Sequence, residues 1–229
     1  EPKQAGSLKE IERGDIRFEH VSFSYDGKRD VLKEISFEVK NGQTIAFVGH
    51  TGSGKSSIIN LFMRFYEFDR GQILIDGQDI KDYSQEALRK SIGLVLQEPF
   101  LYHGTIASNI RMYHEELTDE EIRQAAAFVD VADFIESLPG GYDHPVTERG
   151  STLSTGQRQL LAFARTIAAQ PKILILDEAT ANIDQETEEM IQNSLKKMRQ
   201  GRTTIAIAHR LSTIQDADCI YVLDKGKII

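Results

Sequence analysis

Apolar and polar residues recur with two different periods along the chain, and each period predicts one type of secondary structure. Strict alternation over residues 16–25 indicates a half-buried strand, and residues 31–39 form a second strand that can pair with it as a hairpin. The other apolar runs of strand length are residues 44–48, 71–77, 92–96, 172–176, 203–208 and 219–223. Helical periods cover residues 57–63, 84–90, 105–138, 156–169 and 185–199. This alternation predicts an α/β fold with a mainly parallel sheet, preceded by an antiparallel pair of strands.

The strand at 44–48 and the helix at 57–63 are joined by residues 49–56, Gly-His-Thr-Gly-Ser-Gly-Lys-Ser. This segment fits the phosphate-binding loop pattern Gly-x-x-x-x-Gly-Lys-Ser/Thr, and it has the strand and the helix that the pattern requires on either side. Glycines let the backbone curl around phosphates, and the start of the helix adds its positive dipole end. We expect Lys55 to reach the β- and γ-phosphates of a nucleotide and the Ser56 hydroxyl to coordinate Mg²⁺.

Four polar residues follow the predicted apolar strands at their carboxyl ends, where parallel α/β sheets bind ligands. Gln97 follows the run at 92–96, Asp177 and Glu178 follow the run at 172–176, and His209 follows the run at 203–208. Asp177 suits a Mg²⁺ site, and Glu178 suits the polarisation or deprotonation of an attacking water. His209 can hold a γ-phosphate and orient Glu178, and the Gln97 amide oxygen can reach the metal or the water. Together with the phosphate loop, these residues predict hydrolysis of a nucleoside triphosphate.

Composition narrows the class of protein without changing this prediction. The 229 residues suffice for one large domain or two small ones, and the net charge of −8 argues against general nucleic-acid binding. No apolar run approaches the ~18 residues that cross a bilayer, so we expect no membrane span within this chain. The single cysteine, Cys219, excludes an internal disulfide framework, and its place in the run at 219–223 predicts a small, buried core residue.

The motifs and their order resemble the nucleotide-binding domain of an ATP-binding cassette (ABC) transporter. Residues 49–56 match the Walker A loop, residues 173–177 match Walker B, and Glu178 stands at the position of the family's catalytic carboxylate. Residues 153–157, Leu-Ser-Thr-Gly-Gln, resemble the family signature Leu-Ser-Gly-Gly-Gln. The other matches are Tyr25 for the A-loop aromatic that stacks on adenine, Gln97 for the Q-loop, residues 181–184 for the D-loop and His209 for the H-loop.

The resemblance implies a P-loop NTPase fold with a RecA-like core, an N-terminal antiparallel β subdomain and a helical signature subdomain. It implies that two cassettes sandwich two ATP molecules head to tail, each ATP lying between Walker A of one cassette and the signature of the other. The residues expected to bind nucleotide are Tyr25, Gly49, Thr51, Gly52, Ser53, Gly54, Lys55, Ser56, Ser57, Ser154, Gly156, Gln157 and Asp184. Those expected at Mg²⁺ are Ser56, Gln97 and Asp177, and those expected in catalysis are Glu178, His209 and Gln97.

Two stretches are similar to exporters in particular. Residues 97–110 resemble the exporter pattern after the Q-loop, and residues 147–150 resemble the exporter X-loop; in exporters both regions face coupling helices of the transmembrane domains. The resemblance implies a linker from a transmembrane domain over residues 1–13 and a nucleotide-binding domain over residues 14–229, with a helical subdomain at about 98–160. We expect the chain to stop within a last hairpin, as a truncated domain, and to work at the cytoplasmic face of a cell membrane. The cargo is not encoded in a cassette.

Thr155 departs from the family pattern, because it stands at the third position of Leu-Ser-Gly-Gly-Gln. One interpretation is tolerated drift in a working homodimer. The other, which we favour, is a heterodimeric exporter in which this chain supplies Glu178 and its partner supplies the intact signature.

Two other functions stay open from the sequence: a soluble ABC ATPase of DNA repair or translation, and a nucleotide-binding module with little hydrolysis. The lack of sustained heptads, the single cassette and the exporter-like stretches argue against the first function. The joint presence of Glu178, Gln97 and His209 argues against the second.

Overall fold

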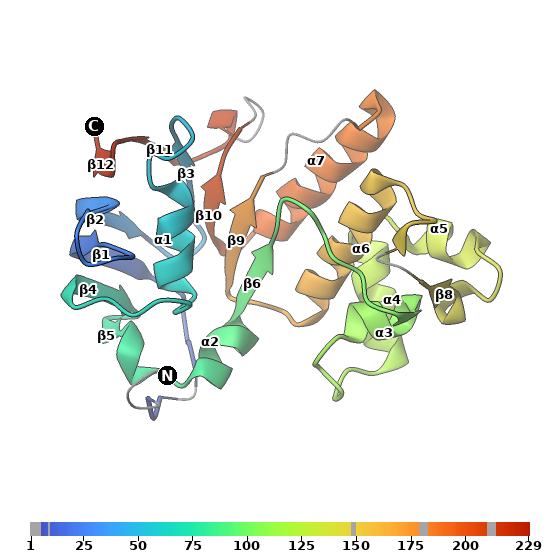
Figure 1. Cartoon of the computed structure of the whole chain (residues 1–229). Helices are drawn as coiled ribbons and strands as arrows, with labels where there is room; N and C mark the ends of the chain where they lie inside the picture. The colour runs from blue at the N-terminus through green and yellow to red at the C-terminus, as the bar shows by residue number, and fades with distance from the viewer. Residues whose placement is uncertain (1–5, 9, 148–149, 179–182, 210–213) are drawn as a thin grey trace. The chain divides into compact units, whose positions relative to one another are not determined.

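The computed structural model describes residues 6–8, 10–147, 150–178, 183–209 and 214–229. The chain divides into two compact units (elements labelled in Figure 1). The first unit comprises residues 1–92, 172–178 and 201–229, and the second comprises residues 93–171 and 179–200. Strand β6 (Ile92–Val95) lies at the passage from one unit to the other.

The first unit contains an antiparallel sheet with the strand order β2-β1-β4-β5. These strands are β1 (Ile16–Phe23), β2 (Leu32–Val39), β4 (Arg70–Ile75) and β5 (Gln78–Asp79). The predicted hairpin is confirmed, because β1 and β2 pair antiparallel with Ile16 opposite Val39. The apolar residues of this hairpin face a core in which the rings of Phe18 and Phe37 stack with centroids 4.4 Å apart.

The parallel sheet of the first unit carries the phosphate loop. Its strands lie in the order β12-β11-β3-β10-β9, and β10 pairs parallel with both β3 and β9. Their bounds are β3 (Thr44–Val48), β9 (Ile173–Asp177), β10 (Thr203–Ile207), β11 (Cys219–Asp224) and β12 (Lys227–Ile228). Among the described residues, this unit contains the helices α1 (Lys55–Phe62) and α2 (Gln85–Ser91) and the 3-10 helix η1 (Ile80–Asp82). Strands β3, β9 and β10 are almost wholly buried, as their continuous apolar runs predict.

The prediction that Cys219 is a buried core residue is wrong. Strand β11 forms where it was expected, but Cys219 is exposed, and Ile220 and Val222 are each more than a third exposed. Within the part of the chain that the structure describes, strand β11 pairs on one side with β3 and on the other with the two-residue strand β12. An apolar run therefore identified the strand, but its position near the sheet edge leaves much of it open to solvent.

The chain segment that leads into β1 is held by one carboxylate. Asp76, at the end of β4, accepts four backbone hydrogen bonds: its Oδ2 from the N–H groups of Glu12 and Arg13, and its Oδ1 from those of Gly14 and Asp15, at 2.8–3.0 Å. Nearby Ile11 is buried. The expected linker over residues 1–13 thus includes, at its end, backbone that is fixed to the β subdomain.

Asp76→Asn is expected to lower the free energy of unfolding by about 2 kcal/mol, because an amide has only one acceptor oxygen. In either orientation of the amide, two backbone N–H groups of residues 12–15 would face its NH₂ donor. Urea denaturation followed by circular dichroism measures this loss. Asp69→Ala is the control, because the Asp69 side chain is 98% exposed; its effect should stay within about 0.5 kcal/mol. Equal effects of the two substitutions would contradict the assignment.

The second unit is mainly helical. Its elements are β7 (Gly104–Thr105), α3 (Ile106–Arg111), α4 (Asp119–Phe128), α5 (Ala132–Ser137), η2 (Gly141–Asp143), β8 (Pro145–Val146), α6 (Thr155–Ala168) and α7 (Gln185–Arg199). The helical period predicted over residues 105–138 is divided into three helices, with left-handed backbone at Met112 and Asp130 between them. The expected strand at 92–96 ends one residue early, and Leu96 is half exposed. Among the described helices, none is both long and apolar enough to cross a membrane.

Candidate functional site

The phosphate loop follows β3 and ends in α1, as the sequence predicts (Figure 1). A Cβ atom at Gly49 would lie 2.4 Å from the Leu223 carbonyl oxygen, so this position admits only glycine without a backbone shift. Gly54 has a φ of 111°, and a Cβ there would lie 2.9 Å from Leu32 Cδ2. The two glycines at the ends of the loop are therefore required by the packing of the loop against its own unit.

The polar groups of the phosphate loop are suited to bind an anion. Lys55 is buried, and its ammonium group donates to the Gly49 carbonyl. Among the described residues, Ser53 Oγ is buried without a hydrogen-bond partner. No side chain caps the N-terminus of α1, so the helix start can offer its N–H groups and its dipole to a phosphate. A buried cation, an unsatisfied hydroxyl and an uncapped helix start together fit a polyphosphate.

Tyr25 lies just beyond β1 and is tied to α1 by its hydroxyl group. That oxygen lies 3.0 Å from Ser57 Oγ and accepts a hydrogen bond of 2.9 Å from Asn60 Nδ2. Its ring meets the rings of Phe23 and Tyr66 edge-on, with centroids 4.8 and 4.9 Å away, and stays 47% exposed. An exposed ring anchored beside the phosphate loop suits base stacking. The sequence did not single out Asn60 or Tyr66, because neither lies in a recognised motif.

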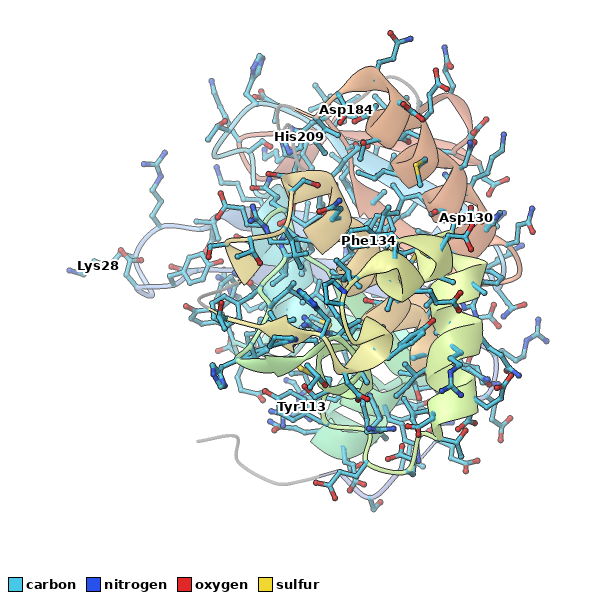
Figure 2. All side chains as sticks on the ribbon, turned by 90° about the vertical axis from the view of Figure 1, so that its right-hand side faces the viewer. Lys28, Tyr113, Asp130, Phe134, Asp184 and His209 are labelled. Atoms are coloured by element: carbon cyan, nitrogen blue, oxygen red, sulfur yellow. The ribbon has the colours of Figure 1, made fainter. Side chains whose placement is uncertain are left out.

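Glu178 is held at the carboxyl end of β9. Asp177 is the last residue of that strand and pairs with Ile207 of β10, and Glu178 N donates to the Ile207 carbonyl at 3.1 Å. Glu178 is buried, and its Oε2 accepts a hydrogen bond of 3.0 Å from the backbone N–H of His209 (labelled in Figure 2). The expected link between His209 and Glu178 therefore exists through the backbone of His209. Residue 209 itself is exposed, so its imidazole is not packed into the unit.

Since β3, β10 and β9 are adjacent and parallel, their carboxyl ends lie at one edge of the sheet. The phosphate loop, His209, Asp177 and Glu178 all follow these strands, so the first unit brings together the residues predicted for phosphate binding and water activation. This common edge can bind a triphosphate and activate a water molecule next to it.

The remaining predicted site residues belong to the second unit. Ser154 caps α6: its Oγ accepts from Gln157 N at 3.1 Å, and Gln157 Oε1 accepts from Ser154 N at 2.9 Å. Asp184, which Figure 2 labels, caps α7 by accepting from Thr187 N at 2.9 Å, and this hydrogen bond lowers the pKa of the Asp184 carboxyl. Gln97 lies exposed in the loop after β6. Residues 181–182 of the expected D-loop and residues 148–149 of the expected X-loop lie outside the described residues.

The family model described as "ABC transporter" matches residues 32–181 of this chain. This match spans the phosphate loop, the signature segment and Asp177 with Glu178. The chain belongs to the ABC transporter family. It therefore contains an ATP-binding domain, and the P-loop NTPase fold expected from the sequence is confirmed.

Relatives of this ABC domain are longer than the chain. It is 72% identical over 229 residues to exp8 of Streptococcus pneumoniae, described as an ABC transporter ATP-binding protein, and covers 39% of that protein. It is 48% identical over 229 residues to the beta-(1-->2)glucan export ATP-binding/permease protein NdvA of Agrobacterium vitis, again covering 39%. The structure of a bacterial Atm1-family ABC exporter with ATP bound superposes with a TM-score of 0.88 at 45% identity, over 98% of this chain and 39% of that one.

The substituted position of the ABC signature is compatible with the helix that it starts. Thr155 is the first residue of α6 and is half-buried. Its Oγ1 accepts a hydrogen bond of 3.3 Å from the Arg158 guanidinium, which also donates to the Leu153 carbonyl at 3.1 Å. Threonine therefore adds bulk at this position without requiring an unusual backbone conformation.

A polar cluster that no sequence motif marks connects α6 of this ABC domain with the exporter-like stretch, residues 97–110. Arg165 of α6 donates to the carbonyl oxygens of Asn109 and Phe100, each at 2.8 Å, and to Asn109 Oδ1 at 3.2 Å. Asn109 is buried and exchanges hydrogen bonds with the backbone of Tyr102. Burial lowers the pKa of the Arg165 guanidinium. No signal in one sequence marks Arg165 as half-buried, because arginine is usually exposed.

Proposed function

We propose that this domain hydrolyses ATP in a head-to-tail pair with a second cassette and so powers export through the transmembrane domains of a longer protein. The observation that carries the proposal is the buried Glu178 carboxylate, fixed by the His209 N–H at the same sheet edge as the phosphate loop. The names of several relatives combine an ATP-binding part with a permease, and the chain covers 39% or less of each of these proteins. The proposed place of action is the cytoplasmic face of a cell membrane.

Each polar group then has a role in phosphate chemistry. Lys55 and the uncapped start of α1 neutralise the phosphates, and Tyr25 stacks on the base. Glu178 takes the proton of the attacking water, and His209 binds the terminal phosphate. Because Glu178 is oriented by a backbone N–H, its position does not depend on the conformation of the His209 imidazole.

The donor set of the site also fits Mg²⁺. The Ser56 hydroxyl and the Asp177 carboxylate are oxygen ligands of the kind that this hard cation prefers, and the Gln97 amide of the second unit has an oxygen of the same kind. Ser56 lies after β3 and Asp177 ends β9, and these two strands flank β10 in the parallel sheet of the first unit. When bound, Mg²⁺ supplies neutralisation of the charge that develops on the phosphate oxygens.

The proposal is tested by ATP hydrolysis of the longer protein with Mg²⁺ and with EDTA. Phosphate release that requires Mg²⁺ and saturates with ATP is expected. Tight ATP binding without Mg²⁺-dependent hydrolysis, both alone and with candidate partner cassettes, would instead favour a nucleotide-binding module.

We further propose that the partner is a different cassette with an intact Leu-Ser-Gly-Gly-Gln signature. This chain keeps Glu178, whereas its own signature carries Thr155, whose side chain reaches Arg158 at the start of α6. That helix start would face the nucleotide of the partner, where added bulk restricts close approach. Glu178 of this chain and the signature of the partner would then form the site with full activity.

Thr155→Gly should raise ATP hydrolysis by the longer protein paired only with itself by about 5- to 20-fold, because it restores the glycine in both signatures. Thr155→Ser is the control: it keeps the hydroxyl bonded to Arg158 and removes only the methyl group, so a smaller gain is expected. The measurement is kcat at saturating ATP. An unmodified protein already as active as its Thr155→Gly variant would favour a homodimer.

A further inference from the structure

The first turn of α6 packs against the first turn of α7 at a single glycine. Gly156 is buried, and a Cβ atom built on it would lie only 2.1 Å from Thr187 Cγ2 and 3.8 Å from Ile183 Cγ2. Atoms of this kind do not approach within 3.0 Å. No other residue therefore fits at position 156 while Thr187 stays in place.

The methyl group of Thr187 is restricted in moving away. The Thr187 backbone N–H donates to Asp184 Oδ1 at 2.9 Å, which fixes its backbone at the start of α7. Threonine is stiff at χ1, so few other directions are open to its methyl group. The methyl group points toward Gly156.

Two physical reasons can require a glycine at the second position of a helix that faces a phosphate. One is close approach of the backbone to the ligand, and the other is close packing against a neighbouring element. A left-handed backbone is not the reason here, because Gly156 has no positive φ and lies inside α6. The short distance to Thr187 favours packing as the reason.

We propose that Thr187 is a positioning residue, whose methyl group fits against Gly156 and sets the spacing between the N-termini of α6 and α7. This inference rests on the proposed function, in which the start of α6 contacts the partner's nucleotide. Asp184, at the start of α7, follows Glu178 by six residues along the chain. In the proposed pair, the signature of this chain serves one ATP and its Glu178 acts on the other ATP. Helix α6, which begins in the signature, contacts α7 at Gly156, and the chain leads from Glu178 to α7.

A cycle of three variants tests the contact: Gly156→Ala, Thr187→Ser, and both together. Thr187→Ser keeps the hydroxyl group and deletes only the methyl group that would clash with a Cβ atom at position 156. Hydrogen–deuterium exchange of residues 183–190, in the nucleotide-free longer protein, should rise about 10-fold in Gly156→Ala and return to within about 3-fold in the double variant. The matched control is Gly156→Ala with Thr187→Val, which keeps a branched side chain and should not recover.

The same variants give a kinetic readout that a merely structural contact would not move. In Gly156→Ala, kcat should fall about 10-fold or more while the KM for ATP changes little, because the phosphate loop is untouched. The double variant should regain kcat to within about 3-fold of the unmodified protein.

Three results would each have a distinct meaning. A double variant that exchanges as fast as Gly156→Ala, or fails to fold, would overturn the contact. If the double variant recovers slow hydrogen–deuterium exchange but not kcat, the positioning role of Thr187 would be overturned. Gly156 would then be required for contact between the backbone and the phosphate. An unmodified protein that hydrolyses no ATP, both alone and with candidate partner cassettes, would contradict the proposed function, whereas the exchange cycle would still decide whether Thr187 and Gly156 act as a pair.

Discussion

Glu178→Gln is expected to lower ATP hydrolysis by about 10²–10⁴-fold, the usual contribution of a positioned general base. Glutamine keeps the size of the side chain and an oxygen that can accept the His209 N–H, so the fold at the end of β9 should survive. What it loses is the negative charge that draws a proton from water. Steady-state phosphate release at saturating Mg²⁺ and ATP measures the effect.

Glu189→Gln is the matched control, because Glu189 is exposed on α7 and the same chemical change there should leave kcat unaltered. A Glu178→Gln variant that keeps a tenth or more of the activity would remove Glu178 from the role of base. The backbone contact with His209 would then be structural.

Lys55→Ala has the second largest expected effect, a loss of about 100-fold in ATP affinity. Lys55 is buried, and its ammonium group is held on the Gly49 carbonyl at the start of the loop. A charge-assisted hydrogen bond contributes about 1.5–3 kcal/mol, which corresponds to roughly 10- to 150-fold in affinity. Equilibrium binding of a fluorescent ATP analogue measures the change.

Lys40→Ala serves as the control for this change, since Lys40 is exposed at the end of the antiparallel hairpin. Arginine at position 55 would be informative too, because it keeps the charge but is too large for the buried position. Unchanged affinity in Lys55→Ala would mean that the uncapped start of α1 binds the phosphates without the lysine.

Sequence periods predicted most elements of both units, because their apolar faces are continuous and their caps are local. Helix α7 has the predicted bounds, and β3 also begins and ends where its apolar run does. The exposure of Cys219 could not be predicted, since it depends on which residues of β11 have a neighbouring strand, and β12 pairs with Leu223 and Asp224 at the far end of β11. The sequence also could not predict that residues 105–138 divide into three helices, because this division depends on left-handed backbone at Met112 and Asp130.

In the candidate site, too, features set by residues adjacent in the chain could be predicted from the sequence, whereas contacts between distant residues could not. The loop of residues 49–56 between β3 and α1 follows from one contiguous motif, so the sequence was sufficient to locate it. The hydrogen bond from His209 N to Glu178 joins residues 31 positions apart and uses a backbone group that no motif records. The contact of Gly156 with Thr187, and the four N–H groups on Asp76, likewise require the folded chain.

The most direct measurement of the central claim identifies the nucleotide that stays bound after incubation with Mg²⁺ and ATP followed by rapid desalting. Glu178→Gln in the longer protein, assayed with a partner cassette if self-pairing is inactive, should retain ATP, whereas the unmodified protein should retain ADP or no nucleotide. Lys55→Ala should retain neither. Retention of ADP by Glu178→Gln would contradict the account. Hydrolysis would then proceed without the carboxylate that the fold holds at the same sheet edge as the phosphate loop.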